Sequence, residues 1–390
     1  MLSKLVRTPQ PFALALVVSL AASAAQAAVF FPTKTTDTAD GACDADCSLR
    51  EAIVAANATA GPHVILLKDE TYVLSRSGAG EDFADTGDLD VREDVMILGV
   101  GADRTAIDGT HLDRVFDVLA GAHAEMQDLA VRNGTVAGAG GGLRSDSELD
   151  IRRCAITANS TSTAGDGGGI ASTGSLRVSA STISGNNAAG DGGGIAAGEF
   201  ATLTNVTVAA NTAAGFGGGL FFLGDTEAPI VHATIATNHA AVRGGGIYGT
   251  ALPFQASHNP ELRLTIVANN SSVTDRDCAE AVTSAGRNLL GEGTNCLDFS
   301  PAKNDLKGTS AALIDAGLAA LGNQGGPTAT IALLASSPAK NAGNTCEATD
   351  QRGQPRDAAC DVGAFETGNA CLASGAALCA NQNRFRVSAT

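Results

Sequence analysis

Short apolar runs recur at a fixed distance along the middle of the chain. Each run begins after three consecutive glycines with a leucine or isoleucine, and the first glycines are separated by 27, 25, 25 and 27 residues. A period of this size predicts supersecondary units that stack on one another rather than one irregular core. The five copies are Gly140–Leu143, Gly167–Ile170, Gly192–Ile195, Gly217–Leu220 and Gly244–Ile247.

An asparagine provides a second alignment of the same units. The asparagines are Asn159, Asn186, Asn211, Asn238 and Asn269. Small or apolar residues stand one, three and five positions before each of them, and alternate residues of a strand face the same side. We therefore expect these three positions to form one inward face. An apolar residue eight positions before the asparagine predicts a second strand, and the residues after the glycines predict a third.

Three short strands per unit describe one coil of a parallel β-helix. Coils stack at the strand spacing of about 4.8 Å, so equivalent residues form columns along the axis. Stacked asparagine amides can then form hydrogen bonds from coil to coil, and glycines permit tight corners. A leucine-rich repeat of similar length would show an L-x-x-L-x-L signature, which this sequence lacks.

The part of the chain before the repeats contains one predicted helix and several strands. Ser48 and Glu51 form a capping box, and Leu49, Ile53 and Ala56 then fall on one face of a helix over residues 49–57. Terminal units of a solenoid need caps, so we expect this helix to cover its first coil. Short β-like runs follow at residues 64–67, 72–74, 95–98 and 115–118.

The amino terminus has the features of a secretory signal. Lys4 and Arg7 precede an apolar run at residues 12–20, and Ala25-Gln26-Ala27 is an A-x-A cleavage site. Removing residues 1–27 leaves 23 cations against 41 anions, a net charge of −18. Such a surface repels nucleic acid and anionic lipid. With no later span expected, the mature chain is predicted to be exported and monomeric.

Nine cysteines in an exported chain predict disulfides. Proximity along the sequence pairs Cys43 with Cys47, Cys278 with Cys296, Cys346 with Cys360, and Cys371 with Cys379. Cys154 remains unpaired and falls in an inward column, which predicts a buried, unreactive thiol. Zinc is the alternative for the cysteines, but no CxxC or His-x-x-x-His spacing supports it.

Two end motifs give a resemblance to a known family. The segment from Cys43 to Asn57 resembles the CSLREA motif of secreted bacterial β-helix proteins, and the repeats are similar to those of polymorphic outer-membrane proteins. The resemblance implies a pectin-lyase-like, right-handed parallel β-helix located outside a bacterium or on its outer surface. The motifs that resemble the family's closing region, called choice-of-anchor Q, are Leu321–Thr328, Ser337–Ala339, Asp350–Gly353 and Cys360–Glu366.

The expected organisation has five parts along the chain. Residues 367–390 form a tail whose alternating end, Arg384–Thr390, looks like the first strand of a further small β domain. The parts are a signal peptide at 1–27, the CSLREA-like cap at 28–62, the β-helix at 63–300, the choice-of-anchor-like region at 301–366, and the tail.

The position just before each glycine triplet carries the candidate chemistry. It holds Asp166 and Asp191 on adjacent units and Arg243 two units later. Two carboxylates about one strand spacing apart suit a Ca²⁺ ion or an acid/base pair. With Arg243 they invite comparison with polysaccharide lyases, which combine Ca²⁺ with a basic residue. The simpler interpretation is that these are polar turn residues facing water.

Other polar groups are interpreted as structural. Arg352 and Arg356 are expected to form ion pairs that close the C-terminal end. The acidic run of Asp85, Asp88, Asp90, Glu93 and Asp94 is interpreted as a solvated loop. The ion-pair partners of the two arginines are expected among Asp350, Asp357 and Asp361. The histidines, interpreted as scattered surface residues without metal spacing, are His63, His111, His123, His232, His239 and His258.

These observations favour a non-enzymatic scaffold for adhesion or interaction, with a lyase or glycoside hydrolase as the alternative. The column before the glycines changes type at every unit, the chain has no Trp, and its negative charge opposes polyuronate substrates unless calcium mediates. No cofactor is required, and calcium is compatible at Asp166 and Asp191. The glycan or protein partner is not identified by the sequence.

Overall fold

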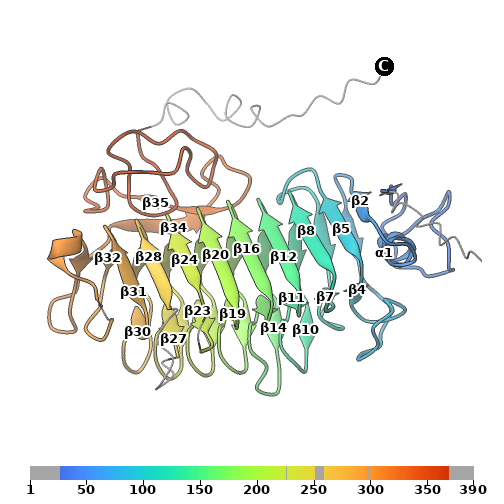
Figure 1. Cartoon of the computed structure of the whole chain (residues 1–390), viewed down its shortest axis with the longest axis horizontal. Coiled ribbons are helices and arrows are strands. Elements are labelled where there is room, and N and C mark those ends of the chain that lie inside the picture. Colours follow the sequence, from blue (N-terminus) through green and yellow to red (C-terminus); the bar gives the residue numbers. More distant parts are fainter. Residues whose placement is uncertain (1–26, 225, 251–258, 297, 369–390) are drawn as a thin grey trace, which may run out of the picture.

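The computed structural model describes residues 27–224, 226–250, 259–296 and 298–368. Most of the expected signal peptide, the Cys371–Cys379 pair and the strand-like end at Arg384–Thr390 lie outside these residues. Over the described part, the chain winds into a long solenoid whose strands stack side by side along one axis (Figure 1). Neighbouring strands of the coils are parallel and in register. The expected all-β parallel solenoid is thus confirmed.

Each coil contributes one strand to each of three long sheets. Sheet 1 begins after the glycines and consists, among the described residues, of β4 (Leu89–Val91), β7 (Phe116–Val118), β11 (Leu143–Ser145), β15 (Ile170–Ser172), β19 (Ile195–Ala197), β23 (Leu220–Phe222), β27 (Ile247–Gly249) and β30 (Cys278–Glu280). Sheet 2 follows with β1 (Val29–Phe30), β2 (Pro62–Leu66), β5 (Asp94–Leu98), β8 (His123–Gln127), β12 (Glu148–Arg152), β16 (Ser175–Ser179), β20 (Phe200–Thr204), β24 (Ala228–Val231), β28 (Pro260–Arg263) and β31 (Thr283–Gly286).

Sheet 3 carries the strands before the asparagines. It consists of β3 (Thr71–Val73), β6 (Ala106–Asp108), β9 (Ala130–Arg132), β13 (Ala155–Thr157), β17 (Thr182–Ser184), β21 (Thr207–Ala209), β25 (Thr234–Ala236), β29 (Ile266–Ala268), β32 (Leu289–Leu290) and β33 (Leu306–Lys307). A short sheet 4, which the sequence pattern does not reveal, contains β10 (Thr135–Val136), β14 (Ser160–Thr161), β18 (Asn187–Ala188), β22 (Thr212–Ala213) and β26 (His239–Ala240).

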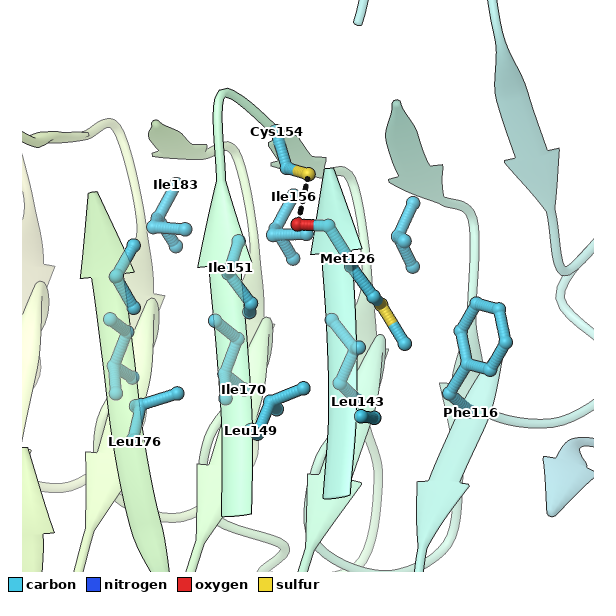
Figure 2. Packing of buried hydrophobic residues seen from close by; sticks show 14 of the residues in the cluster. Phe116, Met126, Leu143, Leu149, Ile151, Cys154, Ile156, Ile170, Leu176 and Ile183 are labelled. Carbon is cyan, nitrogen blue, oxygen red and sulfur yellow. Dashed lines mark hydrogen bonds between the residues drawn. The ribbon is translucent and has the colours of Figure 1, made fainter. Parts of the chain in front are cut away.

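The core is a set of aliphatic columns inside the solenoid. On sheet 2, Ile151 pairs with Val178, which pairs with Leu203, and these side chains are 0–1% exposed. Figure 2 shows the side chains of successive coils stacked between the sheets. Because every coil repeats the same inward positions, each coil covers the core of its neighbour, as expected for a solenoid.

The asparagines occupy a buried column of their own. Asn159, Asn186, Asn211 and Asn238 are at most 1% exposed, and each accepts hydrogen bonds on Oδ1 or donates them from Nδ2 between coils. The prediction that the column continues at Asn269 is wrong. Asn270 accepts the hydrogen bonds from Asn238 at 2.9 Å, whereas Asn269 is exposed with φ +61°.

The position before each asparagine does not face inward as expected. Ala158, Ala210 and Thr237 have φ between +55° and +60°. A left-handed residue interrupts the alternation of the strand and turns the chain through a corner. The asparagine itself therefore takes the inward position, and the residue before it lies outside the core.

The predicted helix is confirmed as α1, Leu49–Asn57, with both hydrogen bonds of the Ser48–Glu51 capping box. Its apolar face joins the core through Leu49, Ile53 and Ala56. The helix lies at the N-terminal end of the solenoid (Figure 1). It thus covers the end of the core, as a cap should.

The segment after the solenoid does not simply close its C-terminal end. The 3₁₀ helix η1 (Pro301–Lys303) and β33 complete the end, and residues 314–366, here called the C-terminal lobe, fold back along the side (Figure 1). The lobe contains an antiparallel hairpin, β34 (Leu318–Gly322) with β35 (Thr330–Leu333). Gln351 accepts a hydrogen bond from Thr207 at 2.6 Å and donates one to Thr182 at 2.9 Å.

Two buried ion pairs organise this lobe. Arg352 pairs with Asp350 at 2.6 Å, and Arg356 pairs with Glu366 at 3.2 Å. Asp357 takes no part in them, contrary to the expectation, because its carboxylate accepts the nearby Ala359 N–H in an exposed turn. The lobe is thereby held against the solenoid's side rather than across its end.

Three disulfides lie within the described residues. They join Cys43 with Cys47, Cys278 with Cys296, and Cys346 with Cys360. These are three of the four pairs expected from proximity. Cys154 is free and fully buried, as predicted.

Candidate functional site

The aspartates before the glycine triplets are engaged by the backbone. Asp166 Oδ1 accepts the Asp191 N–H at 2.7 Å, and Asp191 Oδ1 accepts the Phe216 N–H at 2.7 Å. Burial, with the charge of Asp166 as a smaller cause, raises the pKa of Asp191. Each carboxylate thus fastens its coil to the next one, and only one oxygen of each remains for another partner.

The third candidate of this column, Arg243, is held by two carboxylates. Its Nε donates to Asp275 at 2.6 Å and its Nη1 donates to Glu280. The hydrogen bond from Asp275 is the largest cause that raises the guanidinium pKa. A guanidinium held in this way stays protonated, so it offers charge and hydrogen bonds rather than a base.

The outward column of sheet 1 runs beside these residues and changes in character along the axis. The middle residue of each strand faces away from the core, since its two neighbours are in the core. In coil order, this column contains Asp90, Asp117, Arg144, Ala171, Ala196, Phe221, Tyr248 and Ala279. It is therefore acidic near the N-terminal end and aromatic near the C-terminal end.

The aromatic end is a cluster of three rings, here called the aromatic patch: Phe216, Phe221 and Tyr248. The centroids of Phe216 and Tyr248 are 4.6 Å apart, and Phe221 stacks on Tyr248 at 6.0 Å. Phe216 and Tyr248 are partly exposed. The sequence argument that aromatic residues are scarce therefore overlooks that three of them meet at one place.

Charged groups surround the aromatic patch. Burial and the Glu280 carboxylate raise the pKa of the Tyr248 hydroxyl, and Asp191 and Asp275 act in the same direction. A hollow of about 300 Å³ lies next to them, lined by Asp275 together with Val273, Thr274, Arg276, Glu292, Thr294, Asn295 and Ser310. Asp275 thus connects the hollow to Arg243, and the patch, the ion pairs and the hollow form one continuous region.

At the other end of the column, the structure overturns the expectation of a solvated acidic loop. Asp85 is exposed, but Asp88 and Asp90 are only 5% and 0% exposed. They meet Asp117 of the next coil, and one oxygen of each of the three residues lies within 4.8 Å of the others. Together with the buried Asp113, these residues are called the acidic cluster.

The acidic cluster is strained electrostatically. Burial, with the charge of Asp90 next, raises the pKa of Asp88 to about 8, and burial raises the pKa of Asp90 to about 7. Burial also raises the pKa values of Asp113 and Asp117. Carboxylates directly opposite on neighbouring strands repel each other, so this arrangement requires a compensating positive charge or protons.

Two histidines that the sequence placed on the surface are buried. His63 is 1% exposed and its Nε2 lies 2.7 Å from the Thr59 carbonyl oxygen. His232 lies beside Cys346 and Cys360, a combination that suits a metal ion by residue type. The two cysteines form a disulfide, however, so their sulfur atoms are not thiolate ligands.

A signal for the acidic cluster is present in the sequence. Leu89-Asp90-Val91 and Phe116-Asp117-Val118 share an apolar–Asp–apolar pattern, 27 residues apart. This distance matches the repeat period and places both aspartates in one outward column. The aromatic patch has no such signal, because Phe216 comes from a corner and the other two rings come from strands.

Comparisons with known proteins give little beyond the fold. No protein-family model matches the chain, and no curated protein is similar to it in sequence. The crystal structure of pectate lyase Pel9A aligns over 88% of this chain and 97% of that chain, with 14% identity and a TM-score of 0.42. Within the described residues, no helix has the length and apolar character that crossing a membrane requires.

Proposed function

We propose that the protein is an exported, non-enzymatic interaction scaffold whose aromatic patch binds a carbohydrate. The observation that carries the proposal is the meeting of Phe216, Phe221 and Tyr248 beside Arg243 and Glu280. Binding sites for small ligands combine apolar surface with a few well-placed polar groups. Aromatic rings stack on the apolar face of a sugar ring, and carboxylates and guanidinium groups bind its hydroxyls.

The chemistry of Arg243 favours binding over turnover. A lyase needs a base that removes a proton from the sugar ring, and a catalytic base requires a pKa near the operating pH. Arg243 lies between Asp275 and Glu280, which stabilise its charged form. Asp166 and Asp191 each use one carboxylate oxygen in a hydrogen bond between coils. The lyase or hydrolase interpretation therefore remains the alternative to be tested.

Location outside the cell is part of the proposal. Disulfides form and persist in oxidising compartments, and three of them lie in the described residues. The resemblance of the N-terminal cap to the CSLREA motif and of residues 301–366 to a choice-of-anchor region supports the outer surface of a bacterium. The C-terminal lobe would then stand between the solenoid and whatever follows it.

A binding and turnover assay tests the function. The purified chain is incubated with a panel of neutral and acidic polysaccharides, while binding is followed by affinity electrophoresis and unsaturated products by ultraviolet absorbance. We expect retardation by at least one polysaccharide without an absorbance increase. Tyr248→Ala is expected to abolish the retardation, because it removes the central ring of the patch.

Phe83→Ala is the matched control, because Phe83 is a 60% exposed ring far from the patch in the sequence. Circular dichroism establishes that both variants fold. Equal binding by wild type and Tyr248→Ala would exclude the patch. Unsaturated products that disappear in Asp191→Ala would replace the scaffold by the lyase alternative.

A further inference from the structure

We propose that the acidic cluster is a Ca²⁺ site that fastens the N-terminal cap to the first coils of the solenoid. The ligands are carboxylate oxygens of Asp88, Asp90 and Asp117. This position differs from the one that the sequence favours for calcium at Asp166 and Asp191. The proposal rests on the geometry around the cluster and is independent of carbohydrate binding.

Unpartnered oxygens are the first observation that points to a cation. Asp90 Oδ1 and Asp117 Oδ1 are buried and have no hydrogen-bond partner. The other oxygen of Asp90 accepts the Ala84 N–H at 2.7 Å, so the carboxylate is held in place. A buried carboxylate oxygen without a partner is costly, and a hard cation is the ligand that satisfies several such oxygens at once.

The nearby arginines do not remove this need. Arg114 lies 2.9 Å from Asp88 and 3.3 Å from Asp117, but its Nε and Nη1 form no hydrogen bond. Arg144 lies 3.1 Å from Asp117 and also pairs with Asp146. Four carboxylates thus face two guanidinium groups, one of them shared. The deficit of at least two charges corresponds to one divalent cation.

The spacing of the oxygens suits calcium better than magnesium. One oxygen from each aspartate lies within 4.8 Å of the other two. Around Ca²⁺, with Ca–O distances of about 2.3–2.6 Å, two ligands can be up to about 5 Å apart. Around Mg²⁺ the distances are about 2.0–2.1 Å, and the greatest separation is about 4.2 Å. Calcium also accepts irregular, carboxylate-rich sites more readily.

The cluster lies where three parts of the chain meet. Asp90 belongs to β4, Asp117 belongs to β7 of the next coil, and Asp88 ends the loop that follows Leu74. Arg50 of helix α1 donates to the carbonyl oxygens of Asp88 at 2.9 Å and of Gly87 at 2.7 Å. A cation bound by Asp88 would therefore stabilise the same loop on which the capping helix rests.

Calcium titration of the intact chain tests the proposal. The protein is dialysed against EDTA, and thermal unfolding is followed by circular dichroism while CaCl₂ is added, with NaCl at equal ionic strength as a reference. We expect Tm to rise with CaCl₂ but not with NaCl, and less with MgCl₂. Equilibrium dialysis with elemental analysis is expected to show that one Ca²⁺ binds per chain.

Asp90→Asn is the decisive variant. An asparagine keeps an acceptor for the Ala84 N–H and removes one of the repelling charges, so in EDTA its Tm should equal or exceed that of wild type. Its affinity for Ca²⁺ should fall by roughly tenfold or more, since even an outer partner of a metal ligand is worth that much. Asp85→Asn, an exposed change of the same charge in the same loop, should behave as wild type.

Each of three results would overturn the proposal. Wild-type Tm that CaCl₂ moves no further than NaCl would exclude a specific site. A calcium-dependent shift that persists fully in Asp90→Asn would place the ion elsewhere. An equal response to MgCl₂ would contradict the assignment to calcium.

Discussion

The Oδ1 atom of Asn186 accepts two hydrogen bonds from Asn159, one from its backbone N–H and one from its side-chain amide, each at 3.0 Å. The Nδ2 atom of Asn186 in turn donates to the Ile156 carbonyl oxygen at 2.9 Å and to Asn211 at 3.0 Å. One side chain thus satisfies polar groups on three successive coils, all of them away from water.

Replacing this asparagine should be costly. Asn186→Ala leaves the Asn159 N–H and the Ile156 carbonyl oxygen buried without these partners. Each such loss costs about 1–3 kcal/mol, so we expect the free energy of unfolding to fall by roughly 2–5 kcal/mol in urea denaturation. Asn187→Ala, at the exposed neighbouring position, is the control, and an equal loss there would contradict a specific role for the column.

The second glycine of a triplet should not tolerate a methyl group. A Cβ at Gly193 would lie 2.3 Å from the Gly218 carbonyl oxygen and 2.5 Å from the Thr212 backbone, whereas a Cβ at Gly198 finds no atom closer than 3.7 Å. Because the clash is with backbone on both sides, Gly193→Ala should cost about 3 kcal/mol. Gly198→Ala should change stability by less than about 1 kcal/mol. Denaturant unfolding of the two variants decides this, and similar values would refute it.

His232 should make stability depend on pH. Burial, followed by the charge of Arg356, lowers the pKa of its imidazole to about 3, against about 6.5 in an unfolded chain. Between these values the unfolded chain binds a proton that the folded chain does not. The free energy of unfolding should therefore fall as pH drops from about 6.5 towards 3.

The variant His232→Gln removes this contribution but leaves those of the carboxylates. Its amide can still donate to the Gly363 carbonyl oxygen, which lies 3.3 Å from His232 Nδ1. The difference in unfolding free energy between wild type and variant, measured in urea at several pH values, should shrink as pH falls. His111→Gln, at an exposed histidine, should show no such trend.

The thiol of Cys154 should be inert in the folded protein. Its side chain is 0% exposed, and burial raises its pKa to about 12, so the reactive thiolate is scarce at neutral pH. A maleimide added to the native chain, followed by peptide mapping, should leave Cys154 unmodified, while the same reagent in denaturant should label it. Rapid native labelling would mean that the core of this coil opens readily.

The sequence predicted the solenoid because the repeat is a property of local spacing. Its errors come from positions where spacing is ambiguous. Ile266 and Val267 are both aliphatic and buried, so pattern alone could not determine which of them aligns with Ile235, and the choice of Asn269 over Asn270 followed. The left-handed residues before the asparagines were missed because alanine and threonine give no sign of positive φ.

The candidate sites were harder to predict because they depend on neighbouring coils. Asp88 and Asp90 read as a solvated loop until Asp117, 27 residues later, is placed opposite Asp90. Likewise, the carboxylate of Asp191 looked free until the Phe216 N–H of the next coil was found bound to it. The fold-back of the C-terminal lobe depends on tertiary contacts such as those of Gln351, which no local pattern encodes.

The lobe's contacts also bear on how the molecule resists mechanical load. In a simple solenoid each coil touches only its neighbours, so pulling on one end would peel coils away one after another. Here the lobe forms hydrogen bonds with Thr182, Thr207 and Thr234, which belong to three successive strands of sheet 3, and with Leu264 of the coil after them. These coils are tied together as a unit, and force should rupture them in one step rather than in a series.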